Sequence, residues 1–217
     1  MFVFDRDIID DLPADDRRLS FIHESISEMQ AALHAKNVPL WVLHGRAAEA
    51  LPALAAQLNA AAVVCAEDYE PQAIARDNQV WRALDADGRA LVRVTDQVML
   101  AKAEVMTQQG RPYSVFTPYK RAWLQKLDAF QLTPYPVQRY AHHLAAPPAG
   151  ERLPTLADLG FSATNLGSLA LPPGMQGAQQ LLHDFAPRMA AYQEARDFPA
   201  RKGVSYLSVH LRFGTVS

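Results

Sequence analysis

Several features that would define a protein class at once are scarce in this sequence. A single cysteine, Cys65, excludes an internal disulfide and fits a reducing compartment, so we expect a cytoplasmic protein. Cys65 lies in the apolar run AAAVVCAE, which indicates a buried strand residue rather than a catalytic thiol. No apolar run approaches the roughly 20 residues of a membrane span. The start, MFVFDRDIIDDLP, carries acids where a secretory signal carries bases, so we expect neither export nor a membrane partner.

Positive charge is not in excess either. The 217 residues include 21 Lys and Arg against 23 Asp and Glu, a formal net charge of −2. Because DNA-binding proteins usually carry a basic face, this balance argues against a complete DNA-binding unit but leaves room for a local patch. The histidines have no metal-ligand spacing, even at the pair His142-His143, so no metal is expected. The sequence also has no P-loop, GxGxxG or Ser-His-Asp pattern, and no catalytic residue is assigned.

What the sequence does have is an alternation of apolar strands and amphipathic helices. Strands are predicted at residues 2–4, 40–44, 61–66 and 90–94. Helices are predicted between them, the first with a stripe from Leu19 to Leu33, the second over about 47–58 and the third from Pro71 to about Asp85. This order is typical of βαβ units, and apolar runs without strict alternation fit strands covered on both faces. The predicted fold class is α/β, with a doubly wound, Rossmann-like parallel sheet.

The alternation stops after Gln97. Residues 112–127 predict a turn and a short helix, and a stretch rich in Pro, Leu and Ala follows. A further helix is predicted over about 177–194, and the last twenty residues predict a loop that enters a new helix. We therefore expect an α/β domain over 1–128, an interdomain linker over 129–176, and the start of a helical domain over 177–217.

Four motifs, in order along nearly the whole chain, carry a family resemblance. They are DRDIIDDLPADDRRLSFI (5–22), DYEP with ARD (68–71 and 75–77), GRPYSVFTPYKRAW (110–123) and GVSYLSVHLRFGTVS (203–217). On these motifs the chain resembles the DNA photolyase and cryptochrome family. The resemblance implies an α/β antenna domain followed by the beginning of a helical FAD-binding domain.

The resemblance also implies an activity for the whole family member. A deoxyribodipyrimidine photolyase, a lyase of DNA repair, uses light to pass an electron from reduced FAD to a pyrimidine dimer flipped out of damaged DNA. Family members are more than twice as long as this chain and begin with a strand that lies centrally in the sheet. We therefore expect the chain alone to be inactive. We also expect the gap in the sheet to be closed by altered strand pairing or by self-association with another copy.

The best candidate cofactor segment is Val204-Ser205-Tyr206-Leu207-Ser208. Hydroxyls and backbone N–H groups at the start of a helix favour anions, although Ser205 alone could simply be an N-cap residue. The resemblance implies that Ser205, Leu207 and Ser208 contact the phosphates or ribityl chain of FAD, with Tyr206 in the same segment. It also implies that Tyr192 packs on the flavin. Position 204 is usually Thr in the family, so Val204 removes one hydroxyl donor.

A second chromophore site is expected at Arg18, Asp68 and Glu70. These residues follow strands or begin helices on the side where open α/β sheets bind ligands. The resemblance implies antenna contacts, with a deazaflavin favoured over a folate because Gln72-Ala73 stands where the folate pattern has Asn-Glu. The alternative is that Asp68 and Glu70 only cap the helix that begins at Pro71.

Further alternatives concern the aromatic motif and the function. Aromatic and basic side chains interleave there, which is compatible with stacking on nucleic acid, but the favoured interpretation is that the aromatics anchor the helix against the α/β core. The residues concerned are Tyr113, Phe116, Tyr119, Lys120, Arg121 and Trp123. Two other functions stay open, a cryptochrome-type blue-light photoreceptor and a nucleotide-binding α/β module without photochemistry. The run GRPYSVFTPYKRAW argues against the second.

Overall fold

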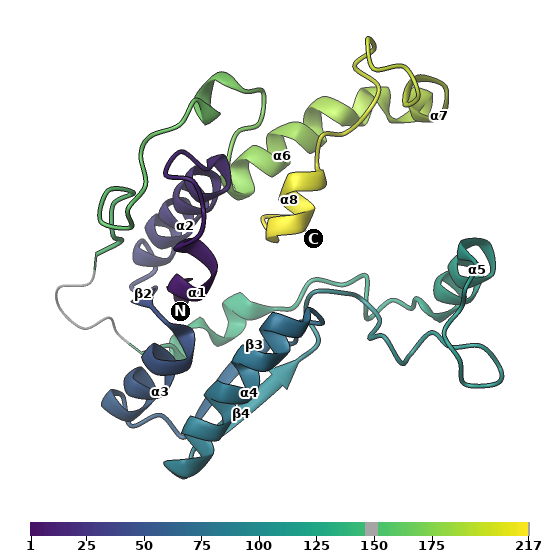
Figure 1. Cartoon of the computed structure of the whole chain (residues 1–217). Helices are drawn as coiled ribbons and strands as arrows, with labels where there is room; N and C mark the ends of the chain where they lie inside the picture. The colour runs from purple at the N-terminus through teal and green to yellow at the C-terminus, as the bar shows by residue number, and fades with distance from the viewer. Residues whose placement is uncertain (146–151, 217) are drawn as a thin grey trace. The chain divides into compact units, whose positions relative to one another are not determined.

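The structure is a computed structural model that describes residues 1–145 and 152–216, so part of the predicted linker (146–151) and Ser217 lie outside it. The chain forms two compact units (Figure 1), one from Met1–Arg46 with Leu144–Ser217 and one from Ala47–His143. The first unit contains β1 (Phe2–Asp5), α1 (Arg6–Ile9), α2 (Arg17–His34), β2 (Val42–Gly45), η2 (Leu166–Ser168), α6 (Gly174–Phe185), η3 (Ala186–Ala191), α7 (Tyr192–Ala195) and α8 (Ser208–Phe213). The second contains α3 (Ala47–Gln57), β3 (Ala62–Ala66), α4 (Pro71–Ala86), β4 (Ala90–Val94), α5 (Phe116–Lys126) and η1 (Val137–His143).

All four predicted strands are present, and they pair in parallel. In the first unit β1 lies beside β2 with Phe2 opposite Val42, and in the second β3 lies beside β4 with Ala62 opposite Ala90. The α/β class with parallel strands is therefore confirmed. The pairing yields two separate two-stranded sheets, not one sheet of four strands. The expectation that altered pairing closes the gap is wrong for the described strands, because none of them pairs outside these two ladders.

The core of the first unit joins its two chain segments. Phe4, Ile9 and Leu19 are buried together with Leu159 and Phe161. Burying such apolar side chains stabilises the unit by roughly 1.5–3 kcal/mol for each large residue. Leu159 and Phe161 lie in the segment predicted as an interdomain linker, and here they are core residues.

Helix α6 begins on the side of α2. The Gly174 N–H donates to Ser25 Oγ at 3.0 Å and the Gln176 N–H to Glu28 Oε1 at 3.1 Å. These bonds satisfy N–H groups of the first turn that the N-cap residue, Pro173, does not reach with its side chain. Figure 1 shows the start of α6 beside α2. Two segments about 150 positions apart are thus joined end to side.

The helix predicted over 177–194 is interrupted. An α-helix covers only Gly174–Phe185, and the chain continues as the 3₁₀ helix η3 and the short helix α7. Pro187 lies at the start of η3, where it has no N–H to donate to the preceding turn. The predicted apolar face is also only partly covered, since Leu181 and Phe185 are buried whereas Met189 is exposed.

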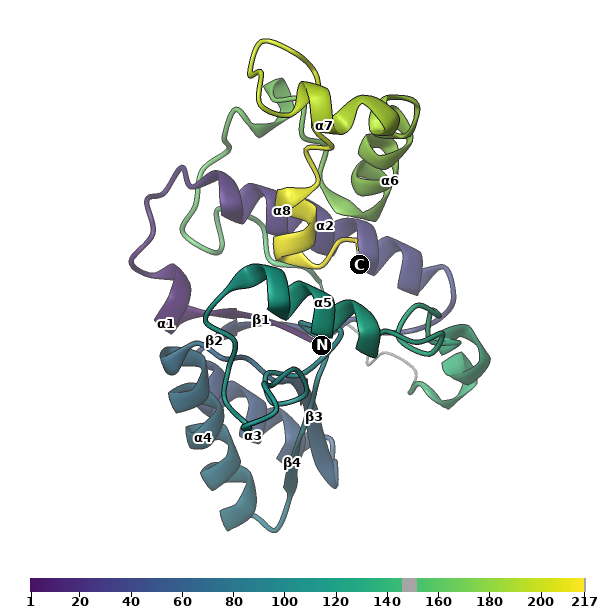
Figure 2. The same ribbon diagram turned by 90° about the vertical axis from the view of Figure 1, so that its right-hand side faces the viewer.

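In the second unit, α3 and α4 pack on one face of the β3–β4 pair (Figure 2). Their core contains Ala55, Val63, Val80 and Leu84. On the opposite face Val64 is 63% exposed and Val92 43% exposed. The side chains alternate between the two faces, as a strand requires.

Helix α5 differs from the other long helices. It contains no buried residue, and Phe116 is 72% exposed. The expected anchoring of the aromatic motif against a core is therefore not found in the part of the chain that the structure describes. No helix among residues 1–145 and 152–216 combines the length and apolarity that crossing a membrane requires.

Candidate functional site

The segment between α7 and α8 has a defined local geometry. The Leu207 N–H donates to Ser205 Oγ at 3.3 Å, so the Ser205 side chain closes a turn just before α8. Leu207 occupies the N-cap position of α8. Tyr206 has a φ of 59°, in the left-handed region that few non-glycine residues adopt. Its side chain is exposed, as is Ser208 at the first position of α8. The hydroxyls and the Tyr206 ring are thus accessible to a ligand.

Helix α8 packs against α2 through a buried histidine. His210 is fully buried, its Nδ1 lies 2.7 Å from Thr215 Oγ1, and its ring meets Phe21 of α2 edge-on at 5.2 Å. Phe213 also contacts Phe21, with ring centroids 5.4 Å apart. Burial lowers the pKa of His210, although the Pro172 carbonyl opposes that shift, so the imidazole is neutral near pH 7. The end of the candidate segment is therefore fixed on α2.

Tyr192, the predicted flavin-packing residue, begins α7. Its ring lies 6.1 Å from that of Phe185 in an edge-on arrangement, and the Arg196 guanidinium lies 5.7 Å from its centroid. The side chain is 40% exposed. The ring is therefore oriented by its neighbours and still open on one side.

The predicted antenna residues all have local partners. Arg18 Nη2 lies 2.6 Å from Asp16 Oδ2, and this bond holds the pKa of Asp16 below its usual range. Asp68 Oδ1 accepts from the Tyr69 N–H at 2.6 Å and from the Glu70 N–H at 3.0 Å, which fixes the turn before α4. Glu70 is the N-cap residue of α4. Arg18 belongs to the first unit, and Asp68 and Glu70 belong to the second.

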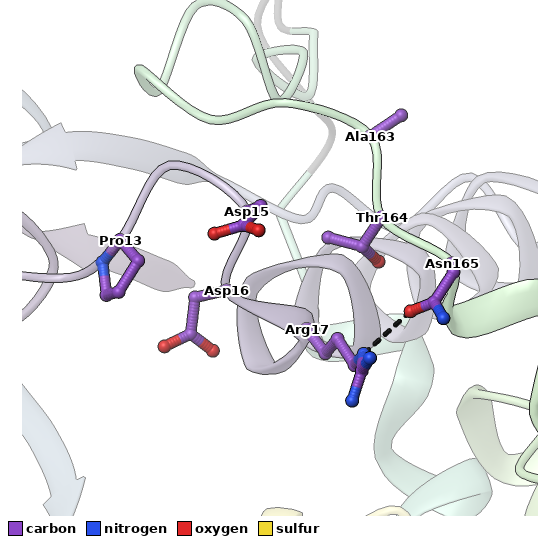
Figure 3. Close-up of a pocket in the computed structure, with 7 residues that line it drawn as sticks. All are labelled: Pro13, Asp15, Asp16, Arg17, Ala163, Thr164 and Asn165. Atoms are coloured by element: carbon purple, nitrogen blue, oxygen red, sulfur yellow. Dashed lines mark hydrogen bonds between the residues drawn. The ribbon is translucent and has the colours of Figure 1, made fainter.

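Figure 3 shows an open pocket at the start of α2 that the sequence did not reveal. Its best-defined feature is the hydrogen bond from Arg17 Nε to Asn165 Oδ1, at 2.7 Å. No sequence signal could have found it, because the two sides are 148 positions apart. The pocket is lined by Pro13, Asp15, Asp16, Arg17, Ala163, Thr164 and Asn165.

Metal and thiol chemistry have little support in the described residues. Across the described ranges, no three side chains of His, Cys, Asp or Glu gather in an arrangement that could hold a metal ion. Cys65 is partly exposed rather than buried as the apolar run predicted, because its strand belongs to a two-stranded sheet. Desolvation, followed by the charge of Asp77, raises the pKa of the Cys65 thiol, so it is protonated at neutral pH.

These observations define a class of structure. It is an α/β unit with parallel strands, joined to short helices that carry exposed hydroxyl groups and aromatic rings. The family model for DNA photolyase matches residues 1–140. The chain is 33% identical over its whole length to the uncharacterized 31.6 kDa protein in the atpI 5' region of Synechococcus sp. (strain PCC 6716), of which it covers 75%. This chain belongs to the DNA photolyase family.

Relatives with named activities are much longer. The chain is 31% identical to the deoxyribodipyrimidine photo-lyase of Synechococcus sp. (strain ATCC 27144), with all of this chain and 45% of that protein aligned. The crystal structure of a bacterial class III photolyase from Agrobacterium tumefaciens matches 94% of this chain and 43% of its own, with a TM-score of 0.76 and 26% identity. An archaeal photolyase from Sulfolobus tokodaii with two FAD molecules shares the fold, with 20% identity and a TM-score of 0.66 over 100% of this chain and 45% of its own. The chain thus spans less than half the length of these photolyases.

Proposed function

We propose that this chain is part of a light-driven deoxyribodipyrimidine photolyase that repairs pyrimidine dimers in damaged DNA by electron transfer from reduced FAD. The observation that carries the proposal is the match of the photolyase family model to residues 1–140, together with full-length alignment to a named photo-lyase. We expect residues 1–217 alone to show no repair, because electron transfer requires a flavin held against the lesion and these residues align with less than half of the named photolyases.

Residues of the first unit would hold the FAD. Ser205 Oγ accepts one hydrogen bond from Leu207, which leaves its own O–H to donate to a phosphate or ribityl oxygen. Tyr206 and Ser208 are exposed near Ser205. The ring of Tyr192 is partly exposed, which suits packing on an aromatic cofactor. This donor set fits the cofactor. When bound, the flavin supplies the light-driven electron, and the residues named here bind and orient it.

Asp68 and Glu70, in the turn before α4 of the second unit, are the proposed antenna residues there. Arg18, at the start of α2 in the first unit, is the other residue proposed for an antenna. A deazaflavin fits the proposal better than a folate because of Gln72-Ala73. The archaeal photolyase with two FAD molecules supports the general idea of a second chromophore in proteins of this fold. The proposed domain plan is 1–128, 129–176 and 177–217, in which the connecting segment 129–176 also supplies Leu159 and Phe161 to the core of the first unit. A cytoplasmic location and self-association of the chain complete the proposal.

A light-dependent repair assay tests the proposed function. Purified residues 1–217 and the deoxyribodipyrimidine photo-lyase of Synechococcus as reference are each given thymine-dimer DNA under near-UV and blue light, with dark controls. We expect repair by the reference and none by residues 1–217. A longer protein that joins this chain to a complete flavin domain should repair the dimers as well. Flavin binding without repair by that protein would favour a blue-light photoreceptor, and absence of flavin binding would favour a nucleotide-binding module.

A further inference from the structure

The chain reverses direction between α7 and α8 through a series of local turns. The Phe198 N–H donates to Ala195 O at 3.1 Å, the Arg201 N–H to Phe198 O at 2.9 Å, and the Gly203 N–H to Arg201 O at 2.8 Å. These bonds lie between the end of α7 and Gly203, and none of them reaches α6 or α8. The direction in which residues 203–208 leave the loop must therefore be set by other contacts.

A cluster of three charged side chains supplies such contacts. Asp184, in the last turn of α6, accepts from Lys202 Nζ at 3.0 Å on Oδ1 and from Arg188 Nη1 at 2.9 Å on Oδ2. Arg188 Nη1 also donates to the Asp184 carbonyl at 2.9 Å, and Arg188 Nη2 reaches the Val204 carbonyl at 3.4 Å. The cluster thus connects α6 to the two residues that flank Gly203. We call Asp184, Arg188 and Lys202 the α6 clamp.

Gly203 allows the clamp to close. It is buried, and a Cβ added to it would lie 2.7 Å from the carbonyl carbon, carbonyl oxygen and Cβ of Ala195. Two of those atoms belong to the backbone at the end of α7, so they cannot move aside as a flexible side chain would. The close approach of these two backbones and the α6 clamp together fix the position of Val204, one residue before Ser205.

We propose that Asp184 is a positioning residue for the 203–208 segment, acting through Lys202 and Arg188. Its carboxylate is the acceptor that the two cations share, and its pKa is lowered first by the bond from Lys202 and then by that from Arg188. Without the negative charge, the two cations would repel each other across a single site, and Lys202 and Val204 would lose their hold on α6. The segment's fixed geometry follows from the fold, and its consequence for FAD rests on the proposed function above.

Amide hydrogen exchange of the whole chain, followed by mass spectrometry, tests the α6 clamp directly. Within residues 203–207, the Gly203 N–H donates to Arg201 O and the Leu207 N–H to Ser205 Oγ. In Asp184→Asn, we expect these two amides to exchange roughly tenfold faster, since a charge-assisted bond is replaced by a weaker neutral one. Amides of α6 and α8 should keep their protection. Lys202→Gln removes the exposed partner, which leaves the fold intact, and should give the same local increase. Asp184→Glu should restore part of the protection.

The matched control is Asp197→Asn. Asp197 lies in the same loop, and its ion pair with Arg196, at 3.7 Å, is outside the clamp. We expect no change at residues 203–207. The proposal is overturned if Lys202→Gln leaves these amides as protected as in the parent chain, or if Asp197→Asn raises their exchange equally. Loss of protection along the whole of α6 in both clamp variants would also overturn it, because the residues would then be structural rather than positioning.

A flavin titration separates this inference from the proposed function. FAD is added to the parent chain and the four variants, and binding is followed by quenching of flavin fluorescence. If 203–208 holds the flavin, Asp184→Asn weakens apparent affinity by about the same factor as it raises exchange, and Asp197→Asn does not. If exchange responds as expected but no variant differs in FAD binding, the clamp is supported and the flavin role of the segment fails.

Discussion

At the scale of single residues, glycines and one buried histidine determine how closely the parts of the first unit approach. Gly174 has a φ of +79°, and a Cβ there would lie 1.9 Å from Glu28 Oε2. Gly203 is confined by backbone atoms of Ala195 instead. His210 occupies the space between α8 and α2 with one identified side-chain partner, Thr215. None of these constraints is visible in composition or periodicity.

The first residue-scale prediction concerns Gly203. We expect Gly203→Ala to lower the free energy of unfolding by roughly 1–3 kcal/mol, because the added methyl group meets backbone that cannot move away. Gly167→Ala is the control, since nothing lies within 4 Å of a Cβ at that position. Chemical denaturation with both variants measures the difference. Equal stability of the two would contradict the close approach of the backbones.

The second residue-scale prediction concerns pH and His210. Burial lowers the pKa of His210 in the folded protein below its usual value of 6.5, so the unfolded chain takes up the proton more readily. Stability from the neutral ring is therefore present above about pH 6.5 and is lost as the pH falls below that value, by at most about 1.4 kcal/mol per unit. Thermal unfolding between pH 7.5 and 5 should show this loss. His210→Phe should flatten the dependence, whereas replacement of the exposed His183 by Phe should leave it unchanged.

At the scale of elements, the strands were the most predictable feature and their packing the least. Runs such as AAVVCA and ALVRV indicated strands because apolar side chains dominate them, and β3 and β4 form there. The same runs also predicted burial on both faces, which is wrong for Val64 because the strand pair has helices on one face. The bonds of Ser25 and Glu28 to the start of α6 could not be predicted, since their partners lie about 150 positions away.

Predictability of the candidate site follows the same division. The motif around Ser205 predicted a candidate cofactor segment, and the structure has a local turn there, in which the Leu207 N–H donates to Ser205 Oγ. The α6 clamp was not predicted, because Asp184 and Lys202 are charged residues of ordinary spacing whose meeting depends on the loop between them. The residues of the local turn could be predicted from the sequence, whereas contacts that depend on the chain reversal between α7 and α8 could not.

The element-scale prediction uses the two faces of β3. Val63 is buried under α3 and α4, and its neighbour Val64 is exposed. Val63→Thr should lower the free energy of unfolding by about 1–3 kcal/mol, because it buries a hydroxyl among apolar groups. Val64→Thr should be nearly neutral and should reduce self-association of the chain. Urea denaturation and light scattering measure the two effects, and a larger loss for Val64→Thr would contradict the assigned faces.

At the scale of the whole molecule, the first unit is made of two stretches of chain and the second of one. Residues 1–46 supply β1, α2 and β2, but Leu159 and Phe161 of the distant stretch complete their core. Residues 47–143 contain their own core around Val63, Val80 and Leu84. The two units therefore depend on chain length in different ways.

Removing residues 144–217 tests this dependence. In a chain of residues 1–143, we expect amides of α2 to lose their exchange protection, because Leu159 and Phe161 no longer cover them. Amides of α4 should remain protected, because their core is intact. Hydrogen exchange of the short and full chains compares the two helices, and undiminished protection of α2 in the short chain would contradict the shared core.

The divided make-up of the first unit has a consequence for the order of events during translation. Its first strand and helix leave the ribosome early, yet the side chains that enclose them are synthesised more than a hundred residues later. During that interval the second unit is already complete and can fold, whereas the apolar side chains of Phe4 and Leu19 stay exposed to solvent. Closing so long a loop is slow compared with local folding. Chaperones that bind nascent chains should therefore engage this protein at its N-terminal forty-six residues, and release it only after Phe161 has emerged.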